Sequence, residues 1–402
     1  MLDRSQARKV VIAIVIACAL APMSLVFAQD TTLTVVGVNV PPEEVGSPLD
    51  LAYQSVVSTF EEQNPNVAVN VVEQPPEFET QIMVDLAAGT APDVWRAGQA
   101  QLPELIEGGY LLDVALMQAV ELGWIEGPRI WPAGHAICPT GGHLDPSTQS
   151  ALAPHMMPLS VEEGIADGID EVRRAVRYQV KHGAKLIKCC ASGGVATRGL
   201  SGAQQYSTEE LAAIADEAHR RGLRVATHCH GDMAVNAALD AGIDCIEHGF
   251  MITEDTVRRM VDAGTFLVST NALTENWDLD QHPEGMRAKA AEVFPKAKAS
   301  LSLAIEAGVK IACGSDAPAI FHGRNAEELE VLVKRGMTPL QAIRAATVVS
   351  ADLIEAPDLG RIAPEMLADI IGVRGEPLND ISVTRKVPFV MQDGKVRKHV
   401  AA

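Results

Sequence analysis

Short apolar runs alternate with amphipathic segments of helical spacing along residues 127–314. The apolar runs predict strands, and apolar positions spaced three or four residues apart predict helices. The predicted strands are 129–137, 184–190, 224–228, 244–248, 266–270 and 310–314, and the predicted helices are 161–182, 207–221, 233–241, 253–263 and 297–307. Six β/α units in this regular order favour a TIM-like barrel, in which the carboxyl ends of the strands carry the chemistry.

A second alternating pattern occupies residues 29–115. Its predicted strands are 32–40, 67–72 and 92–94, and its predicted helices are 49–64 and 80–88. Strand–helix–strand order of this kind predicts a parallel sheet, because parallel neighbours are joined by a crossover helix.

Residues 1–28 have the pattern of a secretory signal peptide. A basic start precedes an apolar run over 10–20, which ends before Pro22, and Ala28 supplies the small residue before a cleavage point. We therefore expect export to the periplasm or the outside of the cell. An uncleaved anchor helix and lipid attachment at Cys18 are the alternatives. No later apolar run is long enough to span a membrane.

Charge and histidine content both change near residue 115. Residues 29–115 hold 14 acidic residues and a single basic one, Arg96, whereas all 11 histidines lie at or beyond His135. Two pieces of different origin, joined near 115–116, explain this break. The net charge of −19 argues against nucleic-acid binding and against docking on anionic membranes.

Six cysteines remain after the predicted cleavage. They lack the regular spacing of a disulfide framework, and most lie in apolar strand-like runs. Buried thiols are typical of a reducing compartment, so the cysteines and the signal peptide point to different locations. The six are Cys138, Cys189, Cys190, Cys229, Cys245 and Cys313.

Polar side chains follow or end several of the predicted strands. Lys188 lies in one, His228 and His230 end the next, His248 ends another, and Asp316 follows the last. A lone histidine is most often a surface or core residue. Several such residues on successive strands instead predict a site for a zinc-type ion, which takes nitrogen and oxygen ligands and keeps a position open for water.

The motifs around these residues resemble the amidohydrolase superfamily, in the branch related to imidazolonepropionase and prolidase-type enzymes. They read KLIKCCASGGV (185–195), VATHCHG (225–231), IDCIEHGF (243–250) and KIACGSDAP (310–318). The resemblance covers residues 116–402. Segments 127–143, 346–373 and 387–396 extend it, the last two resembling the family's final helix and small β domain.

The resemblance implies roles for these residues. Lys188 would be a carboxylated lysine that bridges two metals, and His228 and His248 would bind the second metal. Asp316 would bind the first metal and act as the general base during attack of a metal-bound hydroxide on the carbonyl carbon. The implied cofactor is a divalent metal, with zinc the first choice over manganese or iron.

Two further histidines, His143 and His230, would face the substrate, on its carboxylate or on the developing oxyanion. A structural role is an equal alternative for both. The implied substrate is a small amide, such as an N-acyl amino acid, an Xaa-Pro dipeptide or a cyclic amide. Whether the chain forms a homo-oligomer stays open.

Residues 29–115 resemble another family. The runs FEEQNPNVAVNVVE (60–73) and AAGTAPDVWRAGQAQLPELIEGGYLLDV (87–114) are similar to the N-terminal lobe of extracellular solute-binding proteins of sugar ABC transporters. Such proteins have two lobes around a ligand cleft. Only part of one lobe is recognisable, so a structural fragment is the alternative.

The chain also departs from the amidohydrolase pattern. The family's first strand ends in His-x-His, but the only His-x-His here is His228-Cys229-His230. The sequence therefore predicts an α/β fold: an incomplete TIM-like barrel of strands three to eight over 116–402, a remnant small β domain from about residue 360, and a preceding β-α-β solute-binding fragment. We expect at most one tightly held metal.

Three functions follow from this organisation. The first is a metal-dependent amidohydrolase, and the second is a periplasmic solute-binding component. The third is an inactive chimera, produced by gene fusion or by a join in sequence assembly.

Overall fold

The computed structural model describes residues 31–36, 58, 67–72, 94–95, 113–123, 126–148, 159–197, 199–277, 279, 282–317, 319–320 and 323–400. The chain divides into two compact units, Met1–Ile130 and Trp131–Ala402, which are taken one at a time below. The predicted signal peptide (1–28), the helix at 80–88 and all but one residue of the helix at 49–64 lie outside the described residues.

The first unit contains a three-stranded parallel sheet. Its strands are β1 (Thr31–Val36), β2 (Val67–Val72) and β3 (Val94–Trp95), in the order β2-β1-β3. Strands β1 and β2 pair along their full lengths. The parallel sheet predicted for this region is thus confirmed. Helix α5 (Asp113–Glu121) follows, and the change in composition near residue 115 falls within it.

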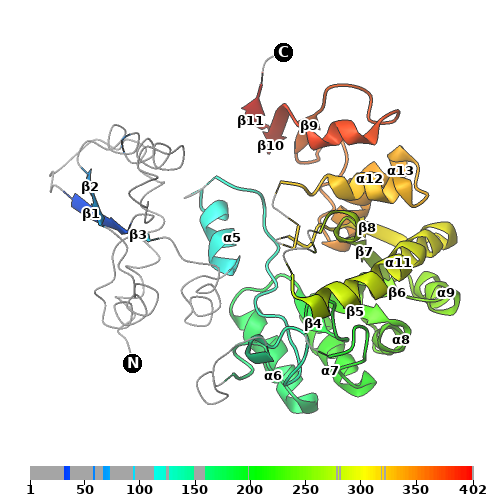
Figure 1. Ribbon diagram of the computed structural model, residues 1–402. Helices are drawn as coiled ribbons and strands as arrows, with labels where there is room; N and C mark the ends of the chain where they lie inside the picture. Colours follow the sequence, from blue (N-terminus) through cyan, green and yellow to red (C-terminus); the bar gives the residue numbers. More distant parts are fainter. Residues whose placement is uncertain are drawn as a thin grey trace. The chain divides into compact units, whose positions relative to one another are not determined.

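The second unit is built on a five-stranded parallel sheet in the order of the chain, β4-β5-β6-β7-β8 (Figure 1). The strands are β4 (Ile187–Cys190), β5 (Val225–Gly231), β6 (Cys245–Met251), β7 (Phe266–Ser269) and β8 (Lys310–Cys313). Because all five are parallel, their carboxyl ends lie at one edge of the sheet.

Helices precede and connect these strands, and each has a predicted counterpart except the short helix Leu273–Asn276. They are α6 (Gly168–Lys181), α7 (Thr208–His219), α8 (Asp232–Asp240), α9 (Glu254–Ala263), α10 (Leu273–Asn276) and α11 (Glu284–Ala307). Ser207 begins α7 with a capping box, in which its side chain accepts from Glu210 N. Left-handed Gly264 and Gly308 end α9 and α11.

The remaining helices follow β8. They are α12 (Glu327–Lys334), α13 (Pro339–Arg344), the five-residue turn Ala345–Val349 and α14 (Ser350–Leu353). No helix within the described residues is both long and apolar enough to cross a membrane.

The two faces of the sheet are buried in different ways. On one face Val225, Cys229, Ile246 and Leu267 join the large core that also holds the apolar sides of the helices. On the other face Cys245, Phe266, Val268 and Ala312 form a smaller cluster, with Ala226 partly buried against it. Strands buried on both faces explain why these runs are almost continuously apolar in the sequence.

Three predicted elements differ from the observed ones. The strand predicted at 129–137 is wrong: only Ile137 makes a β-bridge, to Cys189. Prolines at positions 128 and 132 lack the N–H that a ladder requires. The helix predicted at 161–182 begins only at Gly168, because Gly164 and Gly168 have positive φ. The helix predicted at 297–307 begins at Glu284.

The described part of this sheet therefore has five strands and one added bridge, rather than the six strands predicted. The carboxyl edge, where the predicted site residues gather, is complete for β4 to β8.

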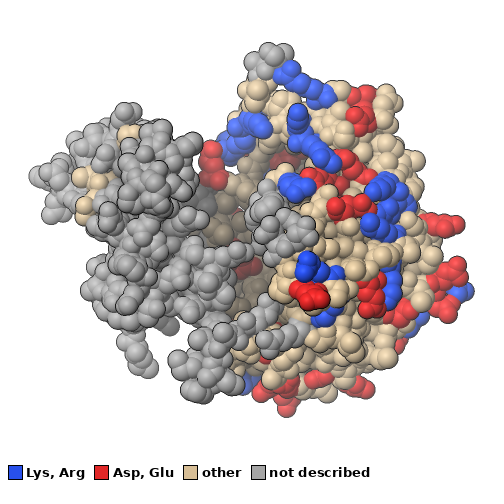
Figure 2. Space-filling model, viewed as in Figure 1, with Lys and Arg blue, Asp and Glu red and all other residues tan. Residues whose placement is uncertain are grey.

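A separate antiparallel sheet lies near the C-terminus. Its strands are β9 (Ile370–Gly372), β10 (Phe389–Gln392) and β11 (Lys395–His399), in the order β11-β10-β9. A short helical turn, Ile381–Arg385, lies between β9 and β10 in the chain. Acidic and basic side chains intermingle over the visible face of the second unit, and basic ones gather near these last strands (Figure 2).

Candidate functional site

One cavity of about 150 Å³ collects every site residue that the sequence predicts. Strands β4, β5 and β6 and the loops after Cys138 and β8 supply them. The polar lining residues are His143, Lys188, His228, His230, His248 and Asp316. Side chains from five separate stretches of sequence thus meet at the carboxyl edge of one parallel sheet.

The imidazoles form a compact cluster. The ring centroids of His143 and His228 lie 3.9 Å apart, and those of His228 and His230 lie 4.5 Å apart. His248 completes the cluster, 4.8 Å from His228 and 5.2 Å from His230. All four histidines are buried.

Backbone strain directs His248 into this cluster. In the sheet register Cys229 pairs with His248 and His228 pairs with Glu247, so regular alternation would place His248 on the face of Cys229. His248 has a φ of 72°, in the left-handed region, and the register shifts at this point. The irregular backbone turns the imidazole toward His228, as strained residues at functional sites often do.

Asp316 shares this strained backbone. Its φ is 54°, and it lies in the loop that follows β8. Burial raises the pKa of its carboxyl group, while the charge of Lys188 opposes that rise. A raised pKa suits a carboxylate that must accept a proton near neutral pH.

Burial keeps the imidazoles neutral. It lowers the pKa of His143 to about 4 and that of His230 to about 3, and the positive charge of Lys188 acts in the same direction. The pKa values of His228 and His248 lie well below the ordinary value for the same reasons. Neutral imidazole is the form that binds a metal ion.

The donor set fits a divalent metal in kind. Among the described side chains, His228 Nε2 and His230 Nδ1 are buried without a hydrogen-bond partner. Such atoms are rare, because an unpaired buried polar atom costs stability, and an ion or a ligand bound in the cavity would satisfy them. No group of three or more His, Cys, Asp or Glu side chains in the described part of the chain is already arranged to hold a metal ion.

Two threonines that were not predicted from the sequence are within hydrogen-bond distance of His143 and His248. Thr197 Oγ1 lies 2.7 Å from His143 Nδ1, and Thr270 Oγ1 lies 2.7 Å from His248 Nδ1. Thr270 directly follows β7 at the same sheet edge, so its position in the sequence could have identified it as a site residue. Gly194 lets His143 approach closely, since a Cβ there would lie 2.1 Å from the ring.

The remaining lining of the cavity is apolar and aromatic. Phe250 stacks on His230 with ring centroids 4.7 Å apart, and Trp277 packs near Phe294. Leu144, Val195 and Leu273 also line the cavity. The lining of the cavity therefore combines four histidines with apolar and aromatic side chains.

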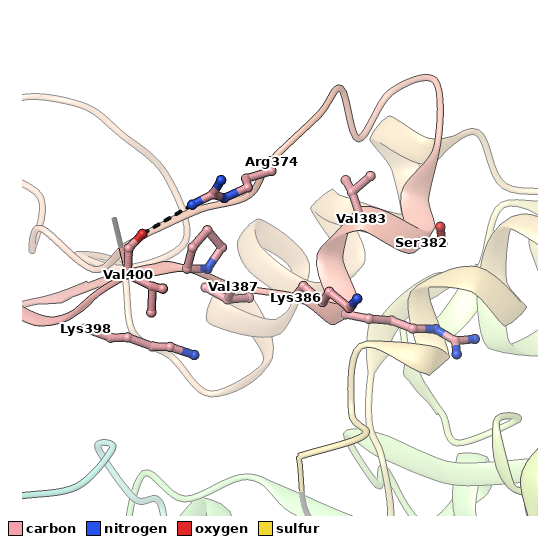
Figure 3. Close-up of a pocket in the computed structure, with 9 residues that line it drawn as sticks. Arg374, Ser382, Val383, Lys386, Val387, Lys398 and Val400 are labelled. Atoms are coloured by element: carbon pink, nitrogen blue, oxygen red, sulfur yellow. Dashed lines mark hydrogen bonds between the residues drawn. The ribbon is translucent and has the colours of Figure 1, made fainter. Parts of the chain in front are cut away.

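A larger cavity of about 830 Å³ lies by the C-terminal sheet and holds none of the predicted site residues. Its basic lining residues are Arg374, Arg385, Lys386 and Lys398 (Figure 3). Arg385 pairs with Glu330, and Arg374 donates to the Val400 carbonyl. The histidine cavity, with its strained and titratable groups, is the better candidate site despite its smaller volume.

Comparisons with known proteins agree with this geometry. The sequence profile of the Amidohydrolase family matches residues 106–398. Ochratoxinase of Aspergillus niger is 38% identical over 312 residues, which cover 72% of this chain and 64% of the ochratoxinase. The chain thus spans less than two thirds of the length of this curated relative.

Two solved structures are also similar to this chain. A Xaa-Pro dipeptidase with bound methionine in its active site matches with a TM-score of 0.68 and 38% identity, covering 71% of this chain and 72% of the dipeptidase. The crystal structure of Aspergillus niger ochratoxinase matches with a TM-score of 0.64 and 34% identity, covering 74% of each chain.

Proposed function

The chain belongs to the amidohydrolase family, and from this we propose that it hydrolyses a C–N bond in a small amide or Xaa-Pro-type dipeptide with the help of a divalent metal ion. The observation that carries the proposal is the convergence of four neutral histidines, Lys188 and Asp316 on one cavity. The strained backbone at His248 and Asp316 supports it, because such strain persists chiefly where function requires it.

We assign the metal to Lys188, His228, His248 and Asp316, with zinc as the first choice. When bound, the ion supplies Lewis acidity and a hydroxide nucleophile near neutral pH. The positive charge of Lys188 lowers the pKa of all four imidazoles, and the same charge would repel a metal cation. Carboxylation of Lys188 would replace that cation with an anionic oxygen ligand.

Asp316 is the proposed general base. In this role its carboxylate would take the proton released during attack and return it to the leaving nitrogen. His143 and His230 are neutral and can donate a hydrogen bond to the substrate carbonyl or carboxylate. The Thr197 contact fixes the His143 ring for this task.

The lining also favours a class of substrate. The aromatic rings of Phe250, Trp277 and Phe294 line the same cavity as the histidines. An amide that carries an apolar group beside the scissile bond would bury that group here, and burial of apolar surface contributes roughly 25 cal/mol per Å². N-acyl amino acids and Xaa-Pro dipeptides with apolar side chains are therefore the first compounds to test.

The decisive experiment measures zinc per mole of the purified chain, together with hydrolysis of these compounds. Wild type should bind about one zinc, consistent with the single tight site expected without a second His-x-His. His248→Ala and Asp316→Ala should lose both zinc and hydrolysis. Hydrolysis that persists in His248→Ala after removal of metal would contradict the proposal.

Export is a separate proposal that rests on residues 1–28. N-terminal sequencing of the protein recovered from expressing cells tests it: a mature chain that begins after Ala28 supports cleavage, and a chain that still begins at Met1 contradicts it. The solute-binding resemblance of 29–115 stays a prediction, and stabilisation by sugars without hydrolysis would favour it.

A further inference from the structure

A buried carboxylate, that of Glu328, accepts hydrogen bonds from the segment at the end of β7. Glu328, in the first turn of α12, is 0% exposed. Its Oε1 accepts hydrogen bonds from the Ser269 hydroxyl and from Asn271 N at 3.1 Å, and its Oε2 accepts from Ala272 N at 2.6 Å. A carboxylate away from water is costly unless such donors satisfy it. Three donors from four consecutive residues therefore tie residues 269–272 to α12.

The tied segment contains the hydrogen-bond partner of a proposed metal ligand. Thr270 lies between the anchored residues, and its Oγ1 is 2.7 Å from His248 Nδ1. The Ser269 carbonyl also accepts from Gly314 N at 2.8 Å, two residues before Asp316. The segment 269–272 is therefore hydrogen-bonded to His248 through Thr270, and to the backbone two residues before Asp316 through Ser269.

Of the four histidines in the cavity, only His248 has a left-handed backbone. Its left-handed backbone opposes the alternation of the sheet, and left-handed conformations of this kind cost on the order of 1–3 kcal/mol. With Nδ1–H donating to the Thr270 hydroxyl, His248 keeps the lone pair of Nε2 for a ligand. The orientation of this ring therefore depends on where residues 269–272 hold Thr270.

We propose that Glu328 is a positioning residue of the metal site, acting through residues 269–272 and Thr270 on the orientation of His248. The inference rests on the proposed function, because it takes His248 to be a ligand. Glu328 does not line the cavity, so it has no direct contact with substrate there. It acts as an outer support, and loss of such supports typically weakens metal binding by about 10- to 100-fold.

A matched control separates positioning from general stability. Glu217 in α7 is also a buried carboxylate, 1% exposed, but its partners are Arg173, Arg177 and Arg221. None of these arginines lines the histidine cavity. Glu217→Gln therefore perturbs a buried carboxylate without touching the support of His248.

The test measures zinc affinity of the full chain by competition with a chromophoric chelator. Glu328→Gln and Thr270→Val should each raise the Kd for zinc about tenfold or more, and Glu217→Gln should leave it unchanged. The double variant should be no weaker than the weaker single variant, because both changes act on the same support. Wild-type zinc affinity in Glu328→Gln, with weakened affinity in Thr270→Val, would overturn the proposal.

A second measurement needs no metal. Nitrogen NMR of the histidine rings in the metal-free chain should show His248 as a single tautomer protonated at Nδ1, assigned by comparison with His248→Gln. This state should be lost in Thr270→Val and in Glu328→Gln but kept in Glu217→Gln. An unchanged His248 signal in Glu328→Gln would refute the positioning role.

The two measurements separate the inference from the proposed function. A wild type that binds no zinc would contradict the function, and the NMR result would still decide the role of Glu328. If Glu328→Gln does not fold, Ser269→Ala removes only one of the three donors. It should then give a smaller loss of zinc affinity in the same direction, and no loss would count against the proposal.

Discussion

Cys229 and His248 are partners in the register of β5 and β6, yet Cys229 packs in the helix-covered core and His248 lines the histidine cavity. The left-handed backbone at His248, followed by left-handed Gly249, makes this separation. The left-handed backbone of β6 at this point therefore brings the His248 side chain into the cavity, beside those from β4 and β5.

Gly249→Ala tests how much this irregularity matters. A Cβ at Gly249 would lie 2.8 Å from Leu267 Cδ1, and φ is 58°. We expect a loss in the free energy of unfolding of roughly 2–6 kcal/mol, the sum of backbone strain and overpacking, measured by urea unfolding. We also expect weaker zinc binding, measured by chelator competition. Gly242→Ala is the control: its φ is 77° but its Cβ would meet nothing within 4 Å, so it should carry the strain alone. Equal losses in both variants would show that packing at Gly249 is unimportant.

Gly194→Ala should displace His143. The new Cβ would lie 2.1 Å from His143 Cε1, so the ring must leave its contact with Thr197. We expect kcat/KM to fall about tenfold or more, the size of effect that misplacing a substrate-contacting group produces, with zinc content unchanged. Gly285→Ala, in open space at the start of α11, should have wild-type kinetics. Normal kinetics in Gly194→Ala would remove His143 from the substrate site.

Glu328 should make stability depend on pH. Burial raises the pKa of this carboxyl group from 4.5 to about 7 in the folded chain. The folded state therefore binds more protons than the unfolded state between these values, and the free energy of unfolding falls as pH rises from about 4.5 to about 7. The full contribution is about 3 kcal/mol. Urea unfolding at several pH values should show this slope in wild type, and Glu328→Gln should be flatter; equal slopes in the two proteins would contradict the shift.

The thiols should react only after unfolding. All six described cysteines are free, and five are buried. Burial raises the pKa of Cys189, Cys229 and Cys245, and thiols react as thiolates. A chromogenic disulfide reagent should label little of the folded chain. In denaturant it should count six thiols if the signal peptide is cleaved, and seven if Cys18 is retained.

The sequence by itself determined which polar residues gather at this edge of the sheet. Strands with ligand-type residues at their carboxyl ends must bring those residues to one edge of a parallel sheet, so Lys188, His228, His230 and Asp316 could be grouped without coordinates. Strands β2, β7 and β8 were placed to within one residue at each end, because buried parallel strands are continuous apolar runs bounded by turns.

Only the tertiary structure decided how those residues are held. Period-two alternation cannot foresee that His248 turns against its register, because the cause is a φ that no neighbouring residue type dictates. Glu328 lies 58 residues after Thr270 in the sequence, and it is joined to the site only through the hydrogen bonds of α12 with the segment after β7. Contacts between distant segments leave no local pattern, so the support that Glu328 gives to this segment could be found only from the folded chain.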